Sequence, residues 1–314
     1  MTRVLLTGAS GYVGSRLAAD LAADPNVTVR ALLRKPSSFV VADERVEVDL
    51  LGDRESIVSA FAGVDTVVHL AGPNELIAAA EPERALAETV LASHRVARAA
   101  ASNGVGRILY VSTVHAYGAR MTDGATLTED QSAEPRAVYA IARLASEHLL
   151  EAANEQGLEV VVFRLTNSVG APAHPDVDRW SLVTNDLCRQ AVSDGELRLR
   201  SAGVQWRDFV ALSDVCRVLA GCLAPGTLAP GTYNLASGTP HTIRDLAGLV
   251  QEAFVAEGWP RPPLVAPDPP PDPPGPYHVS PERLAAAGWR ADTPLSEAVA
   301  ETVRFCLQHR DQLA

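Results

Sequence analysis

The sequence has 314 residues, a formal net charge of -11 at pH 7 and 47% apolar residues. This length exceeds the usual size of a single core, so we expect one large domain with a smaller one appended. The negative charge and the lack of a basic face argue against a nucleic-acid partner. No apolar run is long enough to cross a bilayer, so we expect a cytoplasmic protein without a membrane partner.

The cysteines offer neither a disulfide framework nor a metal site. The 4 cysteines are scattered over apolar stretches, without a CxxC pair and without a histidine at metal spacing. We interpret them as buried core residues and expect no bound metal.

Short apolar runs alternate with alanine-rich segments in the first half of the chain. Strands are expected at residues 3–7, 27–33, 65–70, 107–112 and 159–164, and helices at 15–23, 82–103 and 138–156. β-Branched strands that alternate with helices are typical of a parallel sheet covered on both faces. We therefore expect an α/β fold, with a Rossmann-like doubly wound parallel sheet over residues 1–170.

The pattern changes after Gly170. Prolines and an amphipathic helix around residues 182–192 predict a smaller C-terminal domain over 171–314 that mainly binds substrate. Within 205–240, residues 207–210 and 232–235 have the pattern of strands that return to the first domain. The proline-rich segment 260–276 excludes a helix or a central strand. Two interpretations stay open for it, a polyproline II connector and a stiff lid over the substrate.

The turn after the first strand has the glycine spacing of a dinucleotide phosphate loop. Glycines at these positions give a tight turn, a close approach of backbone to phosphate, and close packing of helix on strand. The alternative is an ordinary glycine-rich turn. We expect the cofactor pyrophosphate at Gly8, Ser10, Gly11, Tyr12, Val13 and Gly14.

The end of the second predicted strand is basic. A carboxylate usually holds the 2'-hydroxyl of NAD there, whereas the 2'-phosphate of NADP needs cations. This position carries Arg34 and Lys35, with Ser37 and Ser38 as further donors. These residues predict NADP(H) as the cofactor, the alternative being a solvated basic turn.

Further motifs follow in order along nearly the whole chain. They are TGASGYVG at 7–14, VDL at 48–50, HLAG at 69–72, VSTVHAYG at 111–118, a tyrosine at 139 with a basic residue four positions later, RLTNSVG at 164–170, RDF at 207–209 and YNLASG at 233–238. Together they resemble the extended short-chain dehydrogenase/reductase family of nucleotide-sugar epimerases, dehydratases and reductases. The resemblance implies that Asp49 and Leu50 flank the adenine and that Ala71 and Leu165 line the cofactor cleft.

The resemblance also implies an active site. The family's Ser/Thr, Tyr and Lys fall on Thr113, Tyr139 and Arg143, of which the last two also bind the cofactor. Tyr139 would protonate the carbonyl oxygen as hydride arrives, with Thr113 bonded to the same oxygen and Arg143 supplying charge. Arginine differs from the family's lysine because a planar guanidinium is not a point-like ammonium. A fourth family position, usually Asn, aligns with Thr89. His115 is a substitute acid or a structural histidine.

The substrate class follows from departures from the family pattern. Val114 and His115 replace the acid pair of the family's dehydratases, which disfavours elimination. Nucleotide-sugar members clamp the diphosphate with residues that correspond to Arg207 and Asn167, and with a loop arginine. The loop position falls near Asp268, where a carboxylate would repel a diphosphate. This argues against a nucleotide-sugar substrate.

We expect an NADPH-dependent ketoreductase that reduces a carbonyl of a small molecule. The expected substrate is a secondary metabolite such as a polyketide aglycone, on which Trp180 and Trp206 would stack unless they pack in the core. A nucleotide-sugar 4-epimerase or 4-ketoreductase and a non-catalytic NADP-binding protein are the alternatives. Family habit implies a homodimer through the helices near 83–103 and 138–156.

Overall fold

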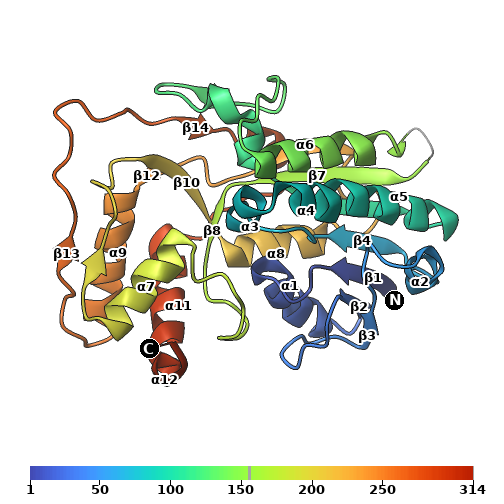
Figure 1. Ribbon diagram of the computed structural model, residues 1–314, viewed down its shortest axis with the longest axis horizontal. Coiled ribbons are helices and arrows are strands. Elements are labelled where there is room, and N and C mark those ends of the chain that lie inside the picture. The colour runs from blue at the N-terminus through green and yellow to red at the C-terminus, as the bar shows by residue number, and fades with distance from the viewer. Residues whose placement is uncertain (155–156, 314) are drawn as a thin grey trace. The chain divides into compact units, whose positions relative to one another are not determined.

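The computed structural model describes residues 1–154 and 157–313 of the chain (Figure 1). They form two compact units. The first comprises Met1–Arg120, Glu129–Leu165 and Cys216–Asn234, and the second comprises Met121–Thr128, Thr166–Val215 and Leu235–Ala314. Among the described residues, no helix has the length and apolar character needed to span a membrane.

The first unit contains a sheet of 7 strands in the order β11-β7-β5-β4-β1-β2-β3. Its strands are β1 (Thr2–Thr7), β2 (Val27–Leu33), β3 (Glu44–Glu47), β4 (Thr66–His69), β5 (Arg107–Thr113), β7 (Glu159–Leu165) and β11 (Gly231–Leu235). The order runs outward from β1 in both directions, and the pairs from β3 through to β7 are parallel. This confirms the doubly wound α/β fold, in which ligands bind at the carboxyl ends of the strands where the order reverses.

Helices cover both faces of this sheet, with α5 and α6 on one face and α1 and α8 on the other (Figure 1). The helices are α1 (Tyr12–Ala22), α2 (Arg54–Ala60), α3 (Glu75–Ala80), α4 (Pro82–Leu86), α5 (Ala92–Ser102), α6 (Val138–Glu151) and α8 (Leu212–Gly221), with a π-helical turn η1 (Ala87–Leu91) and a 3-10 segment η2 (Val114–Arg120). The single helix expected over 82–103 is thus interrupted by η1. The helix expected over 138–156 ends at Glu151, and its expected end at 155–156 lies outside the described residues.

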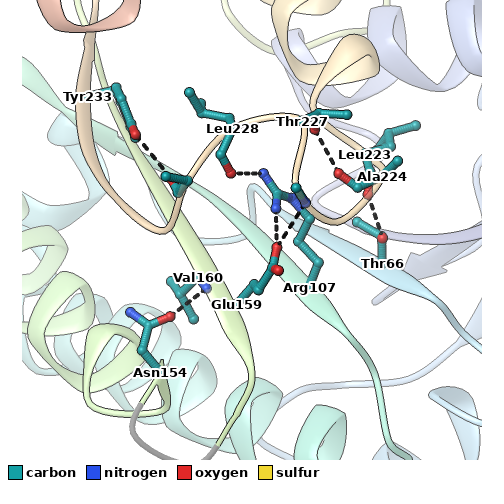
Figure 2. A network of polar contacts seen from close by, with 12 residues as sticks. Thr66, Arg107, Asn154, Glu159, Val160, Leu223, Ala224, Thr227, Leu228 and Tyr233 are labelled. Atoms are coloured by element: carbon teal, nitrogen blue, oxygen red, sulfur yellow. Dashed lines mark hydrogen bonds and ion pairs between the residues drawn. The ribbon is translucent and has the colours of Figure 1, made fainter. Parts of the chain in front are cut away.

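A buried arginine stabilises the end of the sheet at which the strands begin. Arg107 at the start of β5 is fully buried, forms an ion pair with Glu159 at the start of β7, and donates to the carbonyl of Leu228 at 2.7 Å (Figure 2). Nearby, the hydroxyl of Thr66 donates to the carbonyl of Leu223 at 2.8 Å. These contacts hold the returning segment before β11 against the starts of β4, β5 and β7.

The second unit is built on a sheet of 3 strands in the order β12-β10-β8. Its elements are β6 (Thr126–Leu127), β8 (Asn167–Val169), α7 (Val183–Ser193), β9 (Leu197–Arg198), β10 (Trp206–Ala211), β12 (Pro240–Thr242), α9 (Ile243–Ala256), β13 (Leu264–Val265), β14 (His278–Val279), α10 (Glu282–Ala286), α11 (Leu295–Gln308) and α12 (Arg310–Leu313). Apolar side chains from β10, α7, α9 and α11 form its core. Thr242 and Asp245 begin α9 with a reciprocal capping box.

The strand expected at residues 207–210 belongs to the second unit and not to the first. Residues 207–210 were expected to return to the first domain, but β10 pairs with β8 and β12 in the second unit. Only the strand expected at 232–235 joins the large sheet, as β11. A short β-branched run shows that a segment is a strand but not which strand it pairs with.

The proline-rich segment is fastened along the second unit through its own carbonyl groups. Pro262, Pro274 and Pro276 accept hydrogen bonds of 2.8–2.9 Å from Gln251, Trp206 and Gly124. Between 260 and 276 the described elements are limited to the two-residue strand β13, which pairs with β9. Its role as connector or lid stays a prediction, as does the assignment of substrate binding to 171–314.

Candidate active site

The glycine-rich turn between β1 and α1 has the geometry of a phosphate loop. Gly8 has a φ of +71°, and a Cβ there would lie 2.8 Å from the amide nitrogen of Ala71. A Cβ on Gly14 would lie 2.1 Å from the carbonyl oxygen of Gly8, so helix and turn touch through backbone alone. Gly11 precedes α1 without a side-chain cap. A helix N-terminus that no side chain of its N-cap residue covers fits a dinucleotide pyrophosphate.

The segment after β2 combines exposed cations with a buried hydroxyl. Arg34 and Lys35 are exposed, and Arg34 Nη1 lies 2.9 Å from Glu88 Oε1. The hydroxyl oxygen of Ser37 is buried and has no hydrogen-bond partner in the part of the chain that the structure describes. An orphaned buried donor in the same segment as two cations fits a phosphate group at this position.

The segment after β3 is held in one conformation. Asp49 accepts a hydrogen bond of 2.8 Å from the amide of Leu51, while Arg95 of α5 donates to the carbonyls of Leu50 and Gly52 at 3.0 Å each. Leu50 is buried and Asp49 exposed. Sequence reasoning did not identify Arg95, because it lies on another element.

Tyr139 and Arg143 lie one helical turn apart on α6. The guanidinium carbon of Arg143 is 5.5 Å from the ring centre of Tyr139, as the i,i+4 spacing leads one to expect. Arg143 Nη1 also lies 3.4 Å from the carbonyl oxygen of Val111, two residues before Thr113. Thr113 ends β5, is buried, and accepts a hydrogen bond of 3.2 Å from the amide of His115. The structure thus links the elements that carry Thr113, Tyr139 and Arg143.

Arg143 is a buried cation at the carboxyl ends of β4 and β5. It is 6% exposed and donates to the carbonyl of Ala71 at 3.3 Å. Gly72, with a φ of +139°, leaves room for the guanidinium, since a Cβ there would lie 3.0 Å from Arg143 Nη2 and 3.3 Å from Thr89 Oγ1. Burial alone lowers the pKa of Arg143, but the phenols of Tyr110 and Tyr139 raise that pKa overall. The structure thus places a buried positive charge beside the ring of Tyr139.

A neutral histidine supports this edge of the sheet. Burial, followed by the charge of Arg143, lowers the pKa of His69 to about 3. Its Nε2 lies 3.0 Å from Ser93 Oγ, which itself donates to the carbonyl of Thr89, so Nε2 carries the proton. The Nδ1 atom then accepts from the hydroxyl of Thr7 at 2.7 Å. Sequence reasoning cited this residue only as part of the HLAG motif.

A second buried network lies behind Thr113. Its neighbour Ser112 donates to Glu147, which forms an ion pair of 2.8 Å with Arg164. The guanidinium of Arg164 lies 4.8 Å from the ring centre of Tyr117. Sequence reasoning missed this network as well. The available signal was Glu147, an acid four residues after Arg143 on a largely apolar helix.

The expected substrate residues in the second unit are brought together in part. Asn167 lies opposite Phe209 in the parallel pair of β8 and β10, which puts Asn167 on the same sheet face as Arg207. The amide of Asn167 donates to the carbonyl of Asp208 at 2.9 Å, and Arg207 Nη1 donates to the carbonyl of Trp206 at 2.7 Å.

The RDF aspartate has a structural environment. Asp208 is buried and accepts hydrogen bonds of 2.8–3.0 Å from Thr166, Ser237 and Gly238. The pKa of Asp208 is raised overall, because the effect of burial outweighs that of these hydrogen bonds, which lower it. The carboxylate connects β10 to the turn before β12.

The two tryptophans have different neighbours. Trp180 donates to the carbonyl of Pro175 at 3.0 Å and stacks on Phe305 of α11 with 6.3 Å between ring centres, which favours core packing over substrate stacking. Trp206 donates to the proline-rich segment at 2.8 Å. Substrate contact by either ring stays a prediction, as does acid catalysis by His115.

Comparisons with known proteins identify related chains. Residues 4–236 match the model of the NAD dependent epimerase/dehydratase family. GDP-6-deoxy-D-mannose reductase of Pseudomonas aeruginosa is 31% identical over 260 residues, with 81% of each chain covered. The dTDP-6-deoxy-L-talose 4-dehydrogenase (NAD(P)(+)) of Kitasatospora kifunensis is 31% identical over 263 residues, which cover 80% of this chain and 78% of the relative.

A similar solved structure is that of the Thermus thermophilus UDP-glucose 4-epimerase in complex with NAD. It is 26% identical, has a TM-score of 0.82, and the alignment covers 97% of this chain and 98% of the other. These matches confirm the resemblance that the motifs indicated. They contradict the expected substrate class, because these relatives are named for nucleotide-sugars. The prediction of a ketone outside the nucleotide-sugars was wrong.

Proposed function

Because the chain belongs to the NAD-dependent epimerase/dehydratase family and is an enzyme of the extended short-chain dehydrogenase/reductase type, we propose that it is an NADPH-dependent nucleotide-sugar 4-ketoreductase. The observation that carries this proposal is the 31% identity to two relatives named as a reductase and a 4-dehydrogenase of 6-deoxy sugar nucleotides. Val114 and His115, which replace the acid pair of dehydratases, support it.

The residues of the first unit can perform the proton transfer of a carbonyl reduction. The bound cofactor supplies the hydride. Tyr139 gives its phenolic proton to the oxygen of the 4-keto group, and Thr113 donates a hydrogen bond to the same oxygen. The fixed charge of Arg143, 5.5 Å from the ring centre of Tyr139, stabilises the phenolate left behind. The backbone contacts of Arg143 keep that charge in place.

The preference for NADPH rests on the segment after β2. Arg34 and Lys35 are exposed there, and the orphaned hydroxyl of Ser37 lies in the same segment. These groups suit a 2'-phosphate better than a 2'-hydroxyl. Replacing Arg34 with Gln should weaken NADPH binding by about 10-fold and leave NADH binding within twofold, since one charge-assisted hydrogen bond is lost.

The second unit supplies cations for a substrate diphosphate. Arg207 and Asn167 share one sheet face. Arg244 of α9 is our candidate for the loop arginine missing near Asp268, because its Nη2 lies 3.4 Å from the carbonyl oxygen of the preceding residue, Pro267. A cation at this place would offset the repulsion between the carboxylate of Asp268 and the diphosphate of a nucleotide-sugar.

The proposal is tested by turnover. We expect NADPH oxidation with at least one GDP-, dTDP- or UDP-linked 4-keto-6-deoxyhexose, and none with ketones that lack a nucleotide. Cleavage of the 4-keto sugar from its nucleotide should abolish the reaction. Turnover of simple ketones alone, or dehydration of a nucleotide-hexose, would refute the proposed function.

A nucleotide-sugar 4-epimerase is the second candidate. It is favoured by the likeness to the Thermus thermophilus epimerase at 26% identity. Inversion of the 4-hydroxyl of a UDP-hexose without added cofactor would support this candidate against the first. The homodimer and the cytoplasmic location stay predictions.

A further inference from the structure

Arg34, the cation expected to bind the 2'-phosphate on the cofactor's adenosine ribose, already forms an ion pair with a carboxylate, that of Glu88. Arg34 Nη1 lies 2.9 Å from Glu88 Oε1, and Arg84 Nε lies 2.8 Å from the same oxygen. Arg84 also pairs with Glu81 at 3.0 Å. The side chain of Arg34 is 52% exposed and that of Glu88 is 20% exposed. Glu88 is thus shared between two arginines, of which Arg34 is the one proposed to bind the 2'-phosphate.

Arg34 and Glu88 belong to segments that follow different strands of the sheet. Arg34 follows β2, whereas Glu88 belongs to η1, which follows β4, and β1 lies between these two strands in the sheet. The neighbouring Thr89 approaches Gly72, next to the Ala71 amide that abuts Gly8. The Arg34–Glu88 pair therefore joins the two segments that flank the carboxyl end of β1, where a dinucleotide binds in this fold.

We propose that Glu88 is a specificity-determining residue that limits the preference for NADP(H) over NAD(H) by competing with the 2'-phosphate for Arg34. The inference rests on the proposed role of Arg34 in NADP binding. A 2'-phosphate must displace the carboxylate from Arg34 and approach a like charge, and both effects weaken binding. NAD(H) has no such phosphate, so it leaves the pair intact. Displacement stays feasible because Glu88 keeps Arg84 as its partner.

The test is a fluorescence titration of the full chain with NADPH and with NADH. In Glu88→Gln we expect the Kd for NADPH to fall roughly fivefold, the upper range for release of an exposed ion pair, with the Kd for NADH within twofold. Glu81→Gln is the matched control. It removes the same charge beside Arg84, and the ion pair that the described part of the chain gives Glu81 is with Arg84 and not with Arg34, so both Kd values should stay within twofold.

An unchanged or higher Kd for NADPH in Glu88→Gln would overturn the inference. An equal fall of the Kd for NADPH in Glu81→Gln, or an equal fall of the Kd for NADH in Glu88→Gln, would also overturn it. Either result would mean that the loss of a negative charge in this region explains the tighter binding without competition for Arg34. Binding of NADH shows that the variant is folded. If Glu88→Gln does not fold, Glu88→Asp shortens the side chain away from Arg34 while keeping its charge, and the Kd for NADPH should fall by a smaller factor.

The double variant separates this inference from the proposed cofactor preference. In the Arg34→Gln background, Glu88→Gln should no longer tighten NADPH binding, because the two groups act through one contact. If Arg34→Gln alone leaves NADPH binding unchanged, the proposed NADP selection by Arg34 fails. If Arg34→Gln weakens NADPH binding and Glu88→Gln has no effect, only the inference about Glu88 fails.

Discussion

Gly14→Ala tests whether backbone contact shapes the phosphate loop. The added Cβ would lie 2.1 Å from the carbonyl oxygen of Gly8, 2.8 Å from the carbonyl carbon of Gly8 and 3.0 Å from the Cα of Ala9. Ordinary contact begins at 3.4 Å, so the closest approach falls 3.4 - 2.1 = 1.3 Å short. All three atoms belong to the backbone. No side-chain rotation can relieve the overlap, and the loop must move by about 1 Å.

Two opposing effects set the size of the loss. Overpacking costs about 3 kcal/mol when backbone must shift, and alanine in place of glycine in a helix gains about 1 kcal/mol. We expect a net loss of about 2 kcal/mol in the free energy of unfolding. A loop displaced by about 1 Å also misplaces its amide donors, so the Kd for NADPH should rise by about 100-fold.

Gly248→Ala is the matched control for this prediction. Gly248 also lies inside a helix, α9, but a Cβ there would meet no atom within 4 Å. That variant should gain about 0.5–1 kcal/mol and bind NADPH as the wild type does. Urea unfolding and NADPH titration measure both quantities. If Gly14→Ala kept wild-type stability and bound NADPH within threefold of the wild type, the close contact between α1 and Gly8 would be refuted.

Three further predictions address catalysis, pH dependence and the buried ion pair. Tyr139→Phe should lower kcat at least 100-fold while the Kd for NADPH stays within twofold, because only the proton donor is lost. A kcat within threefold of wild type would show that the proton comes from elsewhere. The folded-state pKa of His69, about 3, lies below its unfolded value of 6.5, so the unfolded chain binds a proton that the native state does not. The free energy of unfolding should therefore fall by up to about 1.4 kcal/mol per unit as pH drops from 6.5 toward 3, and less steeply in His69→Asn; parallel profiles would contradict this. Arg107→Met should cost about 3 kcal/mol, since it removes the fully buried cation that pairs with the partly exposed Glu159 and donates to the carbonyl of Leu228, whereas Arg198→Met, from an exposed pair, should cost less than about 0.5 kcal/mol; equal losses would contradict the difference in burial.

Local features of the cofactor half were predictable from the sequence. The three glycines act within one turn and the start of one helix, so their spacing alone predicts the geometry found at Gly8 and Gly14. Tyr139 and Arg143 meet because the i,i+4 spacing of a helix brings them together. The parallel direction of the strands also follows from the alternation of strands and helices.

Contacts between distant segments were not predictable in this way. Glu88 lies 54 residues from Arg34, and no pattern around either residue names the other. The partner of β10 was misjudged for the same reason. The substrate class was misjudged because it was inferred from the carboxylate of Asp268 at one sequence position, and the relatives named for nucleotide-sugars overturned it.

The central claim is that this chain transfers hydride from NADPH to C4 of a nucleotide-linked 4-keto sugar. The most direct measurement follows deuterium from NADPH labelled at C4 of the nicotinamide into a nucleotide-linked 4-keto-6-deoxyhexose, analysed by mass spectrometry and NMR. We predict deuterium on C4 of the sugar and one equivalent of NADPH oxidised per equivalent of product. Inversion of a sugar hydroxyl without net NADPH oxidation, or label transferred only to ketones that lack a nucleotide, would contradict the account.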